Sequence, residues 1–359
     1  MSPIPSTQTA IVEDDTGRPT LVRDAPVPAL RPGMLLVRTV AVALNPSDYK
    51  MGLAFPSAGA VIGMDFAGHV VAVDAEAAAL RPDVQLGDAV CGIVHGSNPG
   101  DHEGGAFGEH VLVYSHLVLK VPEGLELERA ATLGCALLTS CVALWGALRI
   151  VPTPETPAQE SEKAPVLVYG GSTSCGTVAI QLLKLSGLDP IATCSPKNFD
   201  LVKSYGASAC FDYSTPGVAQ AIKTHTKGRL RHAIDCISDQ ASTACCYASL
   251  GRPGGRYASL EVVPAEWKTR EAVKHEFIMC LEGMGREAKL DGEYGRPASQ
   301  EKRDLAAKMF AIYQSLLTDG KLQTHPMEVV GKGFEGILDG LAKLKSGSVS
   351  GRKLVVSLA

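Results

Sequence analysis

The chain has 359 residues, of which 45% are hydrophobic and 20% charged, with 37 glycines and 22 prolines. This length predicts about two domains, each able to bury its own core, and the composition excludes a disordered or collagen-like chain. The formal net charge is −4 and lysines and arginines form no run, which argues against nucleic acid as a partner.

Targeting and membrane signals are weak. The chain begins MSPIPSTQTA, without a basic segment followed by an apolar one, so we expect no secretory signal. The most apolar stretch, residues 133–148, is shorter than the roughly 20 residues that span a membrane, and we expect it in the protein interior, with no membrane partner. The ten cysteines have no regular spacing, which predicts reduced thiols without disulfides in a cytoplasmic protein.

The order of predicted elements changes near residue 140. Residues 34–45, 65–74 and 106–122 read as strands, which predicts a mostly β N-terminal domain. Beyond residue 140, strands alternate with helices, and this alternation is typical of a parallel sheet. Proline and acidic residues at 151–165 indicate an exposed loop. The chain ends in an amphipathic helix followed by a strand bounded by glycine.

A glycine-rich turn between a strand and a helix is the strongest local signal. Residues 166–187 read VLVYGGSTSCGTVAIQLLKLSG, so the helix N-terminus and the turn can present N–H groups to a pyrophosphate. Gly171 and Gly176 permit close approach, although glycines also serve turn geometry alone. The hydroxyls of Ser172, Thr173 and Ser174 are further candidate hydrogen-bond donors to the pyrophosphate, and Cys175 is a further candidate cofactor contact.

The end of the next strand indicates which dinucleotide is bound. NAD enzymes place Asp or Glu there to bind the ribose 2′-OH, whereas this chain has Ser195, Pro196, Lys197 and Asn198. A hydroxyl and a cation suit a 2′-phosphate, so NADPH is the predicted cofactor. Tyr213 is a candidate neighbour of the same phosphate. A solvated Lys197 and a plain strand-end tyrosine are the alternative interpretations.

With these features, the chain resembles the medium-chain dehydrogenase/reductase superfamily along essentially its whole length. The matching N-terminal pieces are NPSDYK (45–50), GMDFAGHVVAV (63–73), LGDAVCG (86–92) and GGAFGEHVLV (104–113). The resemblance implies an α/β fold in which a Rossmann doubly wound parallel sheet joins a GroES-like, mostly β domain. We expect a GroES-like substrate domain at 1–140, a Rossmann NADPH-binding domain at 141–318 and a C-terminal return to the substrate domain at 319–359.

The resemblance also bears on zinc. Alcohol dehydrogenases of the superfamily bind catalytic zinc through a Cys and a His-Glu pair, where this chain has Asn45 and Met64-Asp65. An amide and a thioether are poor zinc ligands, and between residues 91 and 115 only Cys91 could serve a structural zinc. We therefore expect no metal, and His95 and His102 are expected to be exposed loop residues.

Further motifs make the resemblance narrower. NPSDYKMG, YGGSTSCGT, IATCSPKNFDLVKSYGA, DCIS, YGRP and SGRKLVV are similar to the trans-acting enoyl reductases of fungal highly reducing polyketide synthases and of synthase–peptide synthetase hybrids. This similarity implies NADPH-dependent reduction of the α,β double bond of an acyl-carrier-bound polyketide thioester in secondary metabolism, with the synthase as partner. A free-standing quinone or enone reductase, and a non-catalytic NADPH-binding scaffold, are the alternatives.

Lys50 is the leading catalytic candidate, because the resemblance places residues Ser47, Asp48, Tyr49 and Lys50 at the nicotinamide. Its ammonium would stabilise the enolate or donate a proton. Asp48 is expected either to orient Lys50 or to serve as an acid in the first turn of a helix. A surface lysine on a short helix capped by Ser47 is the alternative for Lys50.

Thr139 is the second catalytic candidate, since its hydroxyl lies in an apolar stretch, although a buried Thr often bonds its own helix carbonyl. The resemblance implies further cofactor contacts and an acyl pocket, some of whose apolar members are equally consistent with plain core. The remaining cofactor candidates are Leu260, Glu261, Val349 and Ser350, and the substrate candidates are Thr139, Ser140, Leu144, Met279, Cys280, Leu281, Glu282 and Gly283. Pro264 and the charges that follow it predict a blunted edge strand and a monomer.

Overall fold

The structure is a computed structural model that describes residues 3–358. Contacts between Cα atoms divide it into two compact units. The first unit comprises residues 3–138 and 281–358, and the second comprises residues 139–280.

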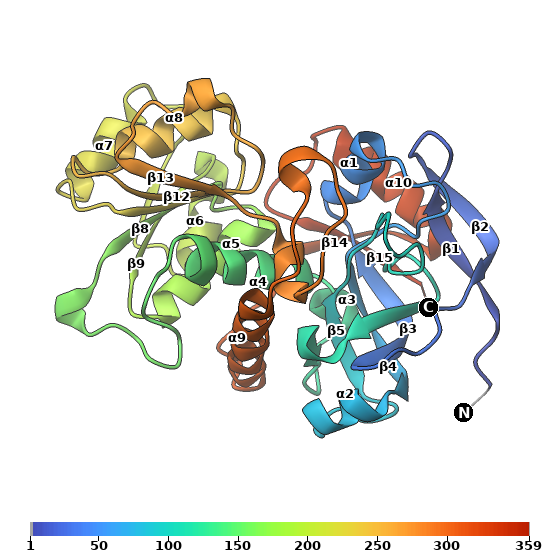
Figure 1. Ribbon diagram of the computed structural model, residues 1–359. Coiled ribbons are helices and arrows are strands. Elements are labelled where there is room, and N and C mark those ends of the chain that lie inside the picture. The colour runs from blue at the N-terminus through green and yellow to red at the C-terminus, as the bar shows by residue number, and fades with distance from the viewer. Residues whose placement is uncertain (1–2, 359) are drawn as a thin grey trace. The chain divides into compact units, whose positions relative to one another are not determined.

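The first unit is built on a mixed sheet with the strand order β14-β15-β3-β4-β5-β7, in which β6 also pairs with β3, and on a hairpin of β1 and β2. The long strand β3 is buried on both faces: Leu35 and Val37 lie in the main core, while Met34 and Leu36 pack in a smaller cluster with Leu112. In Figure 1, α10 lies beside β14 and β15. The elements are β1 (Thr7–Glu13), β2 (Pro19–Pro26), β3 (Met34–Ala43), α1 (Ser47–Ala54), β4 (Asp65–Val73), α2 (Ala75–Leu80), β5 (Ala89–Ile93), β6 (His110–Tyr114), η1 (Ser115–Leu117), β7 (Val118–Lys120), α3 (Leu127–Ala130), η7 (Gly292–Tyr294), α9 (Gln300–Thr318), β14 (Met327–Lys332), α10 (Gly333–Lys345) and β15 (Lys353–Ser357).

The second unit is a six-stranded parallel sheet with the order β10-β9-β8-β11-β12-β13. Helices α5 and α6 cover one face and α7 and α8 the other, as Figure 1 shows. This is the strand order of a doubly wound dinucleotide-binding sheet, so the predicted fold class is confirmed. The elements are η2, a π-helical turn (Val142–Ala147), η3 (Glu160–Glu162), β8 (Pro165–Tyr169), α5 (Ser174–Leu185), β9 (Asp189–Thr193), η4 (Pro196–Asn198), α6 (Phe199–Ser204), β10 (Ala209–Phe211), α7 (Val218–His225), β11 (His232–Asp235), α8 (Gln240–Ser249), β12 (Gly255–Ser259), η5 (Ala265–Trp267) and β13 (Val273–Phe277).

Two short helices, α4 (Gly134–Cys141) and η6 (Cys280–Met284), carry the chain across the division between the units. The helical stretch Leu127–Ala147 is long and apolar enough to span a membrane by length and composition, but 94% of its most apolar window is buried within the protein. The predicted interior position of residues 133–148 is thus confirmed.

The segment 281–318 groups with the first unit, whereas the sequence analysis assigned it to the nucleotide-binding domain. Helix α9 binds the edge strand β7, because the Gln314 side chain accepts a hydrogen bond from Lys120 N (2.7 Å) and donates one to Lys120 O (3.2 Å). A helix that follows a parallel sheet in sequence gives no local sign that its partner is a distant strand. Strand β13, which follows Pro264, forms one edge of the second sheet.

Candidate functional site

The glycine-rich turn joins β8 to α5 in the second unit. Thr173 is the N-cap of α5: its Oγ1 accepts a hydrogen bond from Gly176 N (3.0 Å) and donates one to Gly170 O (2.8 Å). Gly170 adopts a left-handed backbone conformation with φ of 77°. The hydroxyl proton of Thr173 is therefore used within the turn, and Thr173 differs in this respect from its predicted role as a donor to a ligand.

Two further glycines let the turn close on itself. A Cβ on Gly171 would lie 2.8 Å from Ala192 Cβ, and a Cβ on Gly176 would lie 2.4 Å from Gly170 O. Both contacts are too close for any side chain, so turn geometry alone already requires glycine at both positions. A separate observation points to a ligand: Ser174 Oγ is buried and has no hydrogen-bond partner within residues 3–358.

Polar side chains gather around the end of β9. Ser195 Oγ lies 3.2 Å from Tyr213 Oη, and Asn198 Nδ2 donates to Ser172 Oγ at 3.2 Å. Lys197, on η4 between them, is exposed and takes part in no ion pair in the part of the chain that the structure describes. Three hydroxyls, an amide and an available ammonium are the groups that bind a phosphate. These residues fit the 2′-phosphate of NADPH.

The loops after β11 and β12 are joined by a buried network that the sequence analysis missed. Asp235 is fully buried and accepts hydrogen bonds from Tyr257 Oη (2.9 Å) and from Ser238 N (2.9 Å). Ser238, with φ of 62°, accepts in turn from Leu260 N at 2.9 Å. Burial raises the pKa of Asp235. The network fixes the backbone where Leu260 and Glu261 follow β12. The acid of the DCIS motif, Asp235, is the sequence signal that could have predicted this network.

Helix α1 in the first unit carries Lys50. The helix starts at Ser47 after Pro46, and no side chain caps it, so Ser47 is not the N-cap. Ser47 Oγ instead donates to Met64 Sδ at 3.1 Å. Lys50 is exposed, and its ammonium makes no ion pair or hydrogen bond to the residues described here; Tyr49 is half-buried. Lys50 is therefore free to meet a substrate.

Asp48, two residues before Lys50, points into the protein. It is 3% exposed, and its Oδ2 accepts a hydrogen bond from Asn45 N at 2.6 Å. Burial, with a smaller effect of the Asp65 charge, raises the pKa of Asp48 to about 8. Its contacts are to Asn45 and not to Lys50, which favours the interpretation as a first-turn acid over the interpretation as an orienting group.

A buried ion pair lies where the resemblance places zinc ligands. Lys353 Nζ donates to Asp65 Oδ2 and to Asn45 Oδ1, both at 2.6 Å, and Asp65 Oδ1 accepts from Cys135 N at 2.6 Å. The side chains of Lys353 and Asp65 are 4% and 0% exposed. Within residues 3–358, no group of three His, Cys, Asp or Glu side chains is arranged to hold a metal. An ammonium that already compensates the carboxylate, beside an amide, does not fit Zn²⁺.

His95, which the sequence analysis expected in an exposed loop, is only 9% exposed. It directly follows Val94, whose N–H donates to Met64 O at 2.9 Å. The expectation of exposure is therefore wrong for His95. His102 is exposed, as expected, and its Nε2 lies 3.1 Å from Ser57 Oγ.

The apolar helix α4 and the turn η2 hold the predicted substrate residues Thr139, Ser140 and Leu144. Thr139 is 5% exposed, and Ser140 and Leu144 are fully buried. Ser140 Oγ has no hydrogen-bond partner among the described residues. The burial suits core packing as well as a pocket wall, so their role in substrate binding stays a prediction.

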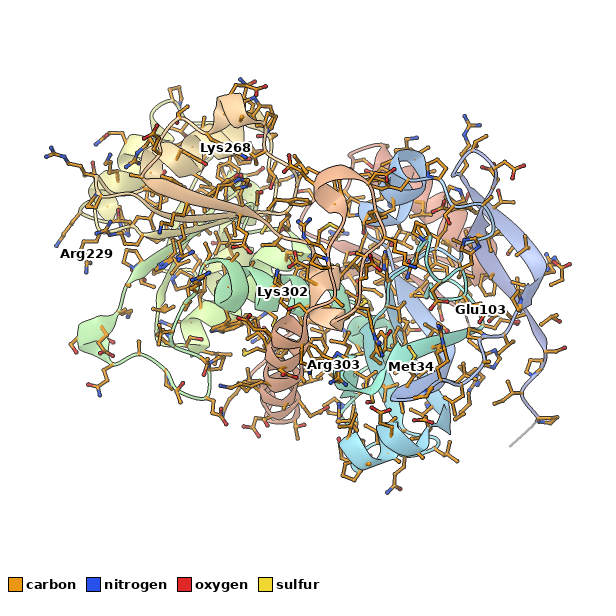
Figure 2. The ribbon with its side chains drawn as sticks, in the orientation of Figure 1. Met34, Glu103, Arg229, Lys268, Lys302 and Arg303 are labelled. Atoms are coloured by element: carbon orange, nitrogen blue, oxygen red, sulfur yellow. The ribbon has the colours of Figure 1, made fainter. Side chains whose placement is uncertain are left out.

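The other predicted substrate residues form or adjoin η6. Met279 and Cys280 are half-buried, whereas Leu281, Glu282 and Gly283 are buried. Glu282 pairs with Arg296 (Nε to Oε1, 2.8 Å) and with Lys302. Figure 2 shows Lys302 near the start of α9. These ion pairs hold η6 in place.

The last two predicted cofactor residues precede β15. Val349 is half-buried and packs against the core of the first unit, and Ser350 is exposed. Their contact with a cofactor also stays a prediction.

Comparisons with known proteins identify the relatives of this chain. The family described as alcohol dehydrogenase GroES-like domain matches residues 31–123, and the family described as zinc-binding dehydrogenase matches residues 175–274. The trans-enoyl reductase poxP of Penicillium oxalicum is 47% identical over 354 residues, which cover 98% of this chain and 93% of that protein. The trans-enoyl reductase TwmE of Talaromyces wortmannii is 47% identical over 364 residues, covering 98% of each chain.

Among solved structures, the CurK enoyl reductase superposes with a TM-score of 0.74 at 18% identity, covering 98% of this chain and 99% of that one. At this identity the likeness concerns the fold alone.

Proposed function

The chain belongs to the trans-enoyl reductases of the medium-chain dehydrogenase/reductase superfamily, and on this premise we propose that it uses NADPH to reduce the α,β double bond of a polyketide thioester held on an acyl carrier. The partner would be a highly reducing polyketide synthase or a synthase–peptide synthetase hybrid, met in the cytoplasm by a monomer. The observation that carries the cofactor assignment is the phosphate-binding cluster at the end of β9, with Lys197 exposed beside three hydroxyls.

The residues of the second unit would bind the cofactor. Ser174 and the N-terminus of α5 suit the pyrophosphate, and Ser172, Ser195 and Lys197 suit the 2′-phosphate. Leu260 is held by Ser238 at the carboxyl edge of the sheet, where ligands of such sheets bind. When bound, NADPH supplies the hydride that adds to the β-carbon of the thioester.

Lys50 would act on the charge that this addition creates. As the β-carbon gains hydride, negative charge develops on the thioester oxygen, and an ammonium there stabilises the enolate. Protonation at the α-carbon then completes the reduction, with Lys50 or solvent as the proton source. Thr139 is the second candidate for a hydrogen bond to the thioester.

The proposal is tested with purified protein, NADPH and a 2-enoyl thioester of pantetheine or of a carrier protein. We expect loss of NADPH absorbance and a product heavier by two hydrogens. Lys50→Ala should lower kcat by about 10²-fold, because one stabilising donor at a developing oxyanion has about that effect. NADPH affinity should stay within about twofold of the parent protein, since Lys50 is absent from the phosphate cluster.

Lys345→Ala, which removes an exposed lysine at the end of α10, is the matched control and should keep full activity. Rapid quinone reduction without any thioester reduction would overturn the proposal. Unchanged kcat in Lys50→Ala would remove Lys50 from the mechanism.

A further inference from the structure

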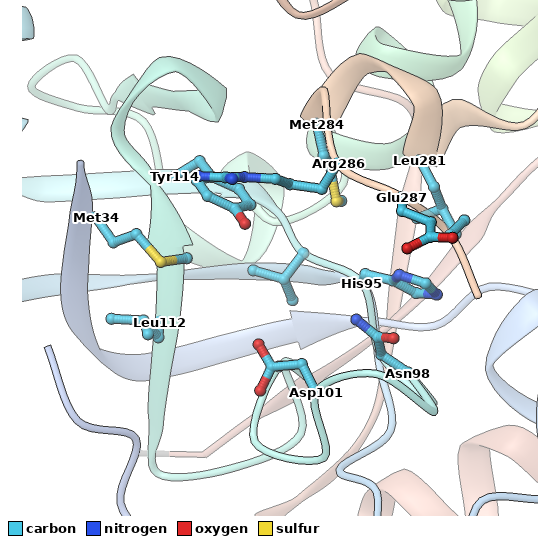
Figure 3. A pocket seen from close by; sticks show the side chains of 13 residues that line it. Met34, His95, Asn98, Asp101, Leu112, Tyr114, Leu281, Met284, Arg286 and Glu287 are labelled. Carbon is cyan, nitrogen blue, oxygen red and sulfur yellow. The ribbon is translucent and has the colours of Figure 1, made fainter. Parts of the chain in front are cut away.

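A cavity of about 50 Å³ lies within the first unit (Figure 3). Of its lining residues, only Leu281 is among the predicted substrate residues. Residues of β3, β6 and the loop after β5 line one side, and the segment 281–288 lines the other. A water molecule occupies roughly 10–15 Å³ by the same measure, so the cavity holds about four such volumes. It is large enough for the end of a flexible chain and too small for a nucleotide.

About half of the wall is apolar. Met34 and Leu112 contribute from β3 and β6, Val94 from the end of β5, and Leu281 and Met284 from η6, and each is at most 6% exposed. Methionine side chains are flexible and polarisable, so they adapt to alkyl groups of different shape. The wall therefore suits a saturated or branched hydrocarbon end.

One polar side chain in the cavity lacks a partner. His95 is 9% exposed, and its Nε2 is buried without a hydrogen bond within the described part of the chain. Burial lowers the pKa of His95 to about 4, so the ring is neutral at pH 7 and can donate or accept one hydrogen bond at Nε2, depending on its tautomer. Figure 3 shows the imidazole beside Asn98, on the floor of the cavity. A ligand oxygen in the cavity would satisfy His95 Nε2.

Two of the three charged side chains at the cavity already have a partner within the protein. Asp101 forms an ion pair with Arg31 at 2.7 Å. The Arg286 guanidinium lies over the Tyr114 ring, 5.8 Å from its centroid, which stabilises the cation at the rim (Figure 3). Glu287 is exposed to solvent. An uncharged ligand is therefore favoured over an anion or a cation.

Hydrogen bonds join the wall of the cavity to α1, the helix that carries Lys50. Val94 N donates to Met64 O at 2.9 Å, and Met64 Sδ accepts from Ser47 of α1. At the other end of α1, the Phe55 ring packs edge-on against Tyr294 at 5.1 Å, in the loop that follows residues 281–288. All these contacts lie within one unit. The reacting end of a chain at Lys50 and its far end in the cavity would thus both be held by residues of the first unit.

We propose that this cavity binds the end of the acyl chain remote from the thioester, and that His95 hydrogen-bonds a hydroxyl or carbonyl oxygen carried there. This inference rests on the proposed function and names the part of the substrate that the first unit selects. The cavity would make reduction depend on chain length and on an oxygen near the chain end.

The test uses the protein with NADPH and pantetheine thioesters of 2-enoic acids of increasing length, from four to twelve carbons. Each longer chain is also tested with a terminal hydroxyl. For the parent protein we expect kcat/KM to rise about tenfold once the chain end reaches the cavity. Met284→Phe, which fills the cavity, should abolish that rise through a higher KM. It should leave the four-carbon substrate within twofold of the parent.

Met284→Leu conserves volume and is the matched control. Met34→Phe fills the cavity from the opposite wall, should Met284→Phe fail to fold. His95→Leu should reduce the preference for the hydroxyl-ended over the methyl-ended chain about tenfold without changing the four-carbon rate.

A second readout is the Kd of a saturated long-chain acyl-pantetheine, which cannot react, measured by calorimetry. Met284→Phe should raise this Kd about tenfold, the factor expected for kcat/KM. Two results would overturn this inference alone. In the first, the parent protein reduces the four-carbon thioester but its kcat/KM does not rise with chain length. In the second, kcat/KM rises with chain length equally in the parent protein, in Met284→Phe and in Met34→Phe. A parent protein that reduces no thioester of any length would overturn the proposed function together with it.

Discussion

Replacing Lys353 by methionine tests the buried cluster that stands in place of a metal site. Lys353 Nζ makes two short hydrogen bonds, to Asp65 and to Asn45, and both partners are buried. Lys353→Met removes the cation but keeps the length of the side chain, so Asp65 is left with its charge uncompensated. We expect this to lower the free energy of unfolding by about 3–5 kcal/mol, the effect of breaking a buried ion pair from one side. That is a large share of the roughly 5–15 kcal/mol of a whole domain.

Equilibrium unfolding in urea, followed by far-UV circular dichroism, measures the loss. Hydrogen exchange locates it, because amides of β15 and of the paired end of β3 should exchange faster while those of the second unit do not. Lys321→Met removes a lysine from an exposed ion pair with Asp319 and should cost less than about 1 kcal/mol. Adding Asp65→Asn to Lys353→Met should restore part of the stability, since no charge then remains buried. A loss in Lys353→Met no larger than in Lys321→Met would refute the reasoning.

Two further predictions concern the cofactor and pH. Lys197→Ala should raise the Kd for NADPH about tenfold and leave the Kd for NADH unchanged, because only the 2′-phosphate contacts this lysine. Fluorescence titration with each coenzyme measures the two Kd values. An equal rise in both would contradict the assignment of Lys197 to the 2′-phosphate. Asp48 has a pKa near 8 when folded, so between about pH 4 and pH 8 the native state holds more protons than the unfolded chain and the stability contributed by this group falls as pH rises. The free energy of unfolding of Asp48→Asn should therefore rise relative to that of the parent protein, by up to about 1.4 kcal/mol per pH unit between pH 5 and 7. A difference between the two proteins that does not change with pH in urea unfolding would show that Asp48 is ionised when folded.

The sequence by itself determined the features that depend on neighbouring residues. The strand, glycine-rich turn and helix at 166–187 follow from local periodicity and from backbone conformations that only glycine adopts, and the structure has β8, Gly170 and α5 there. The absence of an acid directly after β9 is likewise a local fact, since Ser195 and Lys197 stand there in the sequence.

Only the tertiary structure decided which distant side chains meet. Lys353 reaches Asn45 and Asp65 across 308 and 288 residues of sequence, and no local pattern could have paired them. In the same way, His95 lines one cavity with the distant segment 281–288, and the buried carboxylate of Asp48 accepts a hydrogen bond from Asn45 N. Propensity and periodicity describe what a segment does within a few residues, whereas burial and charge compensation depend on what packs against it.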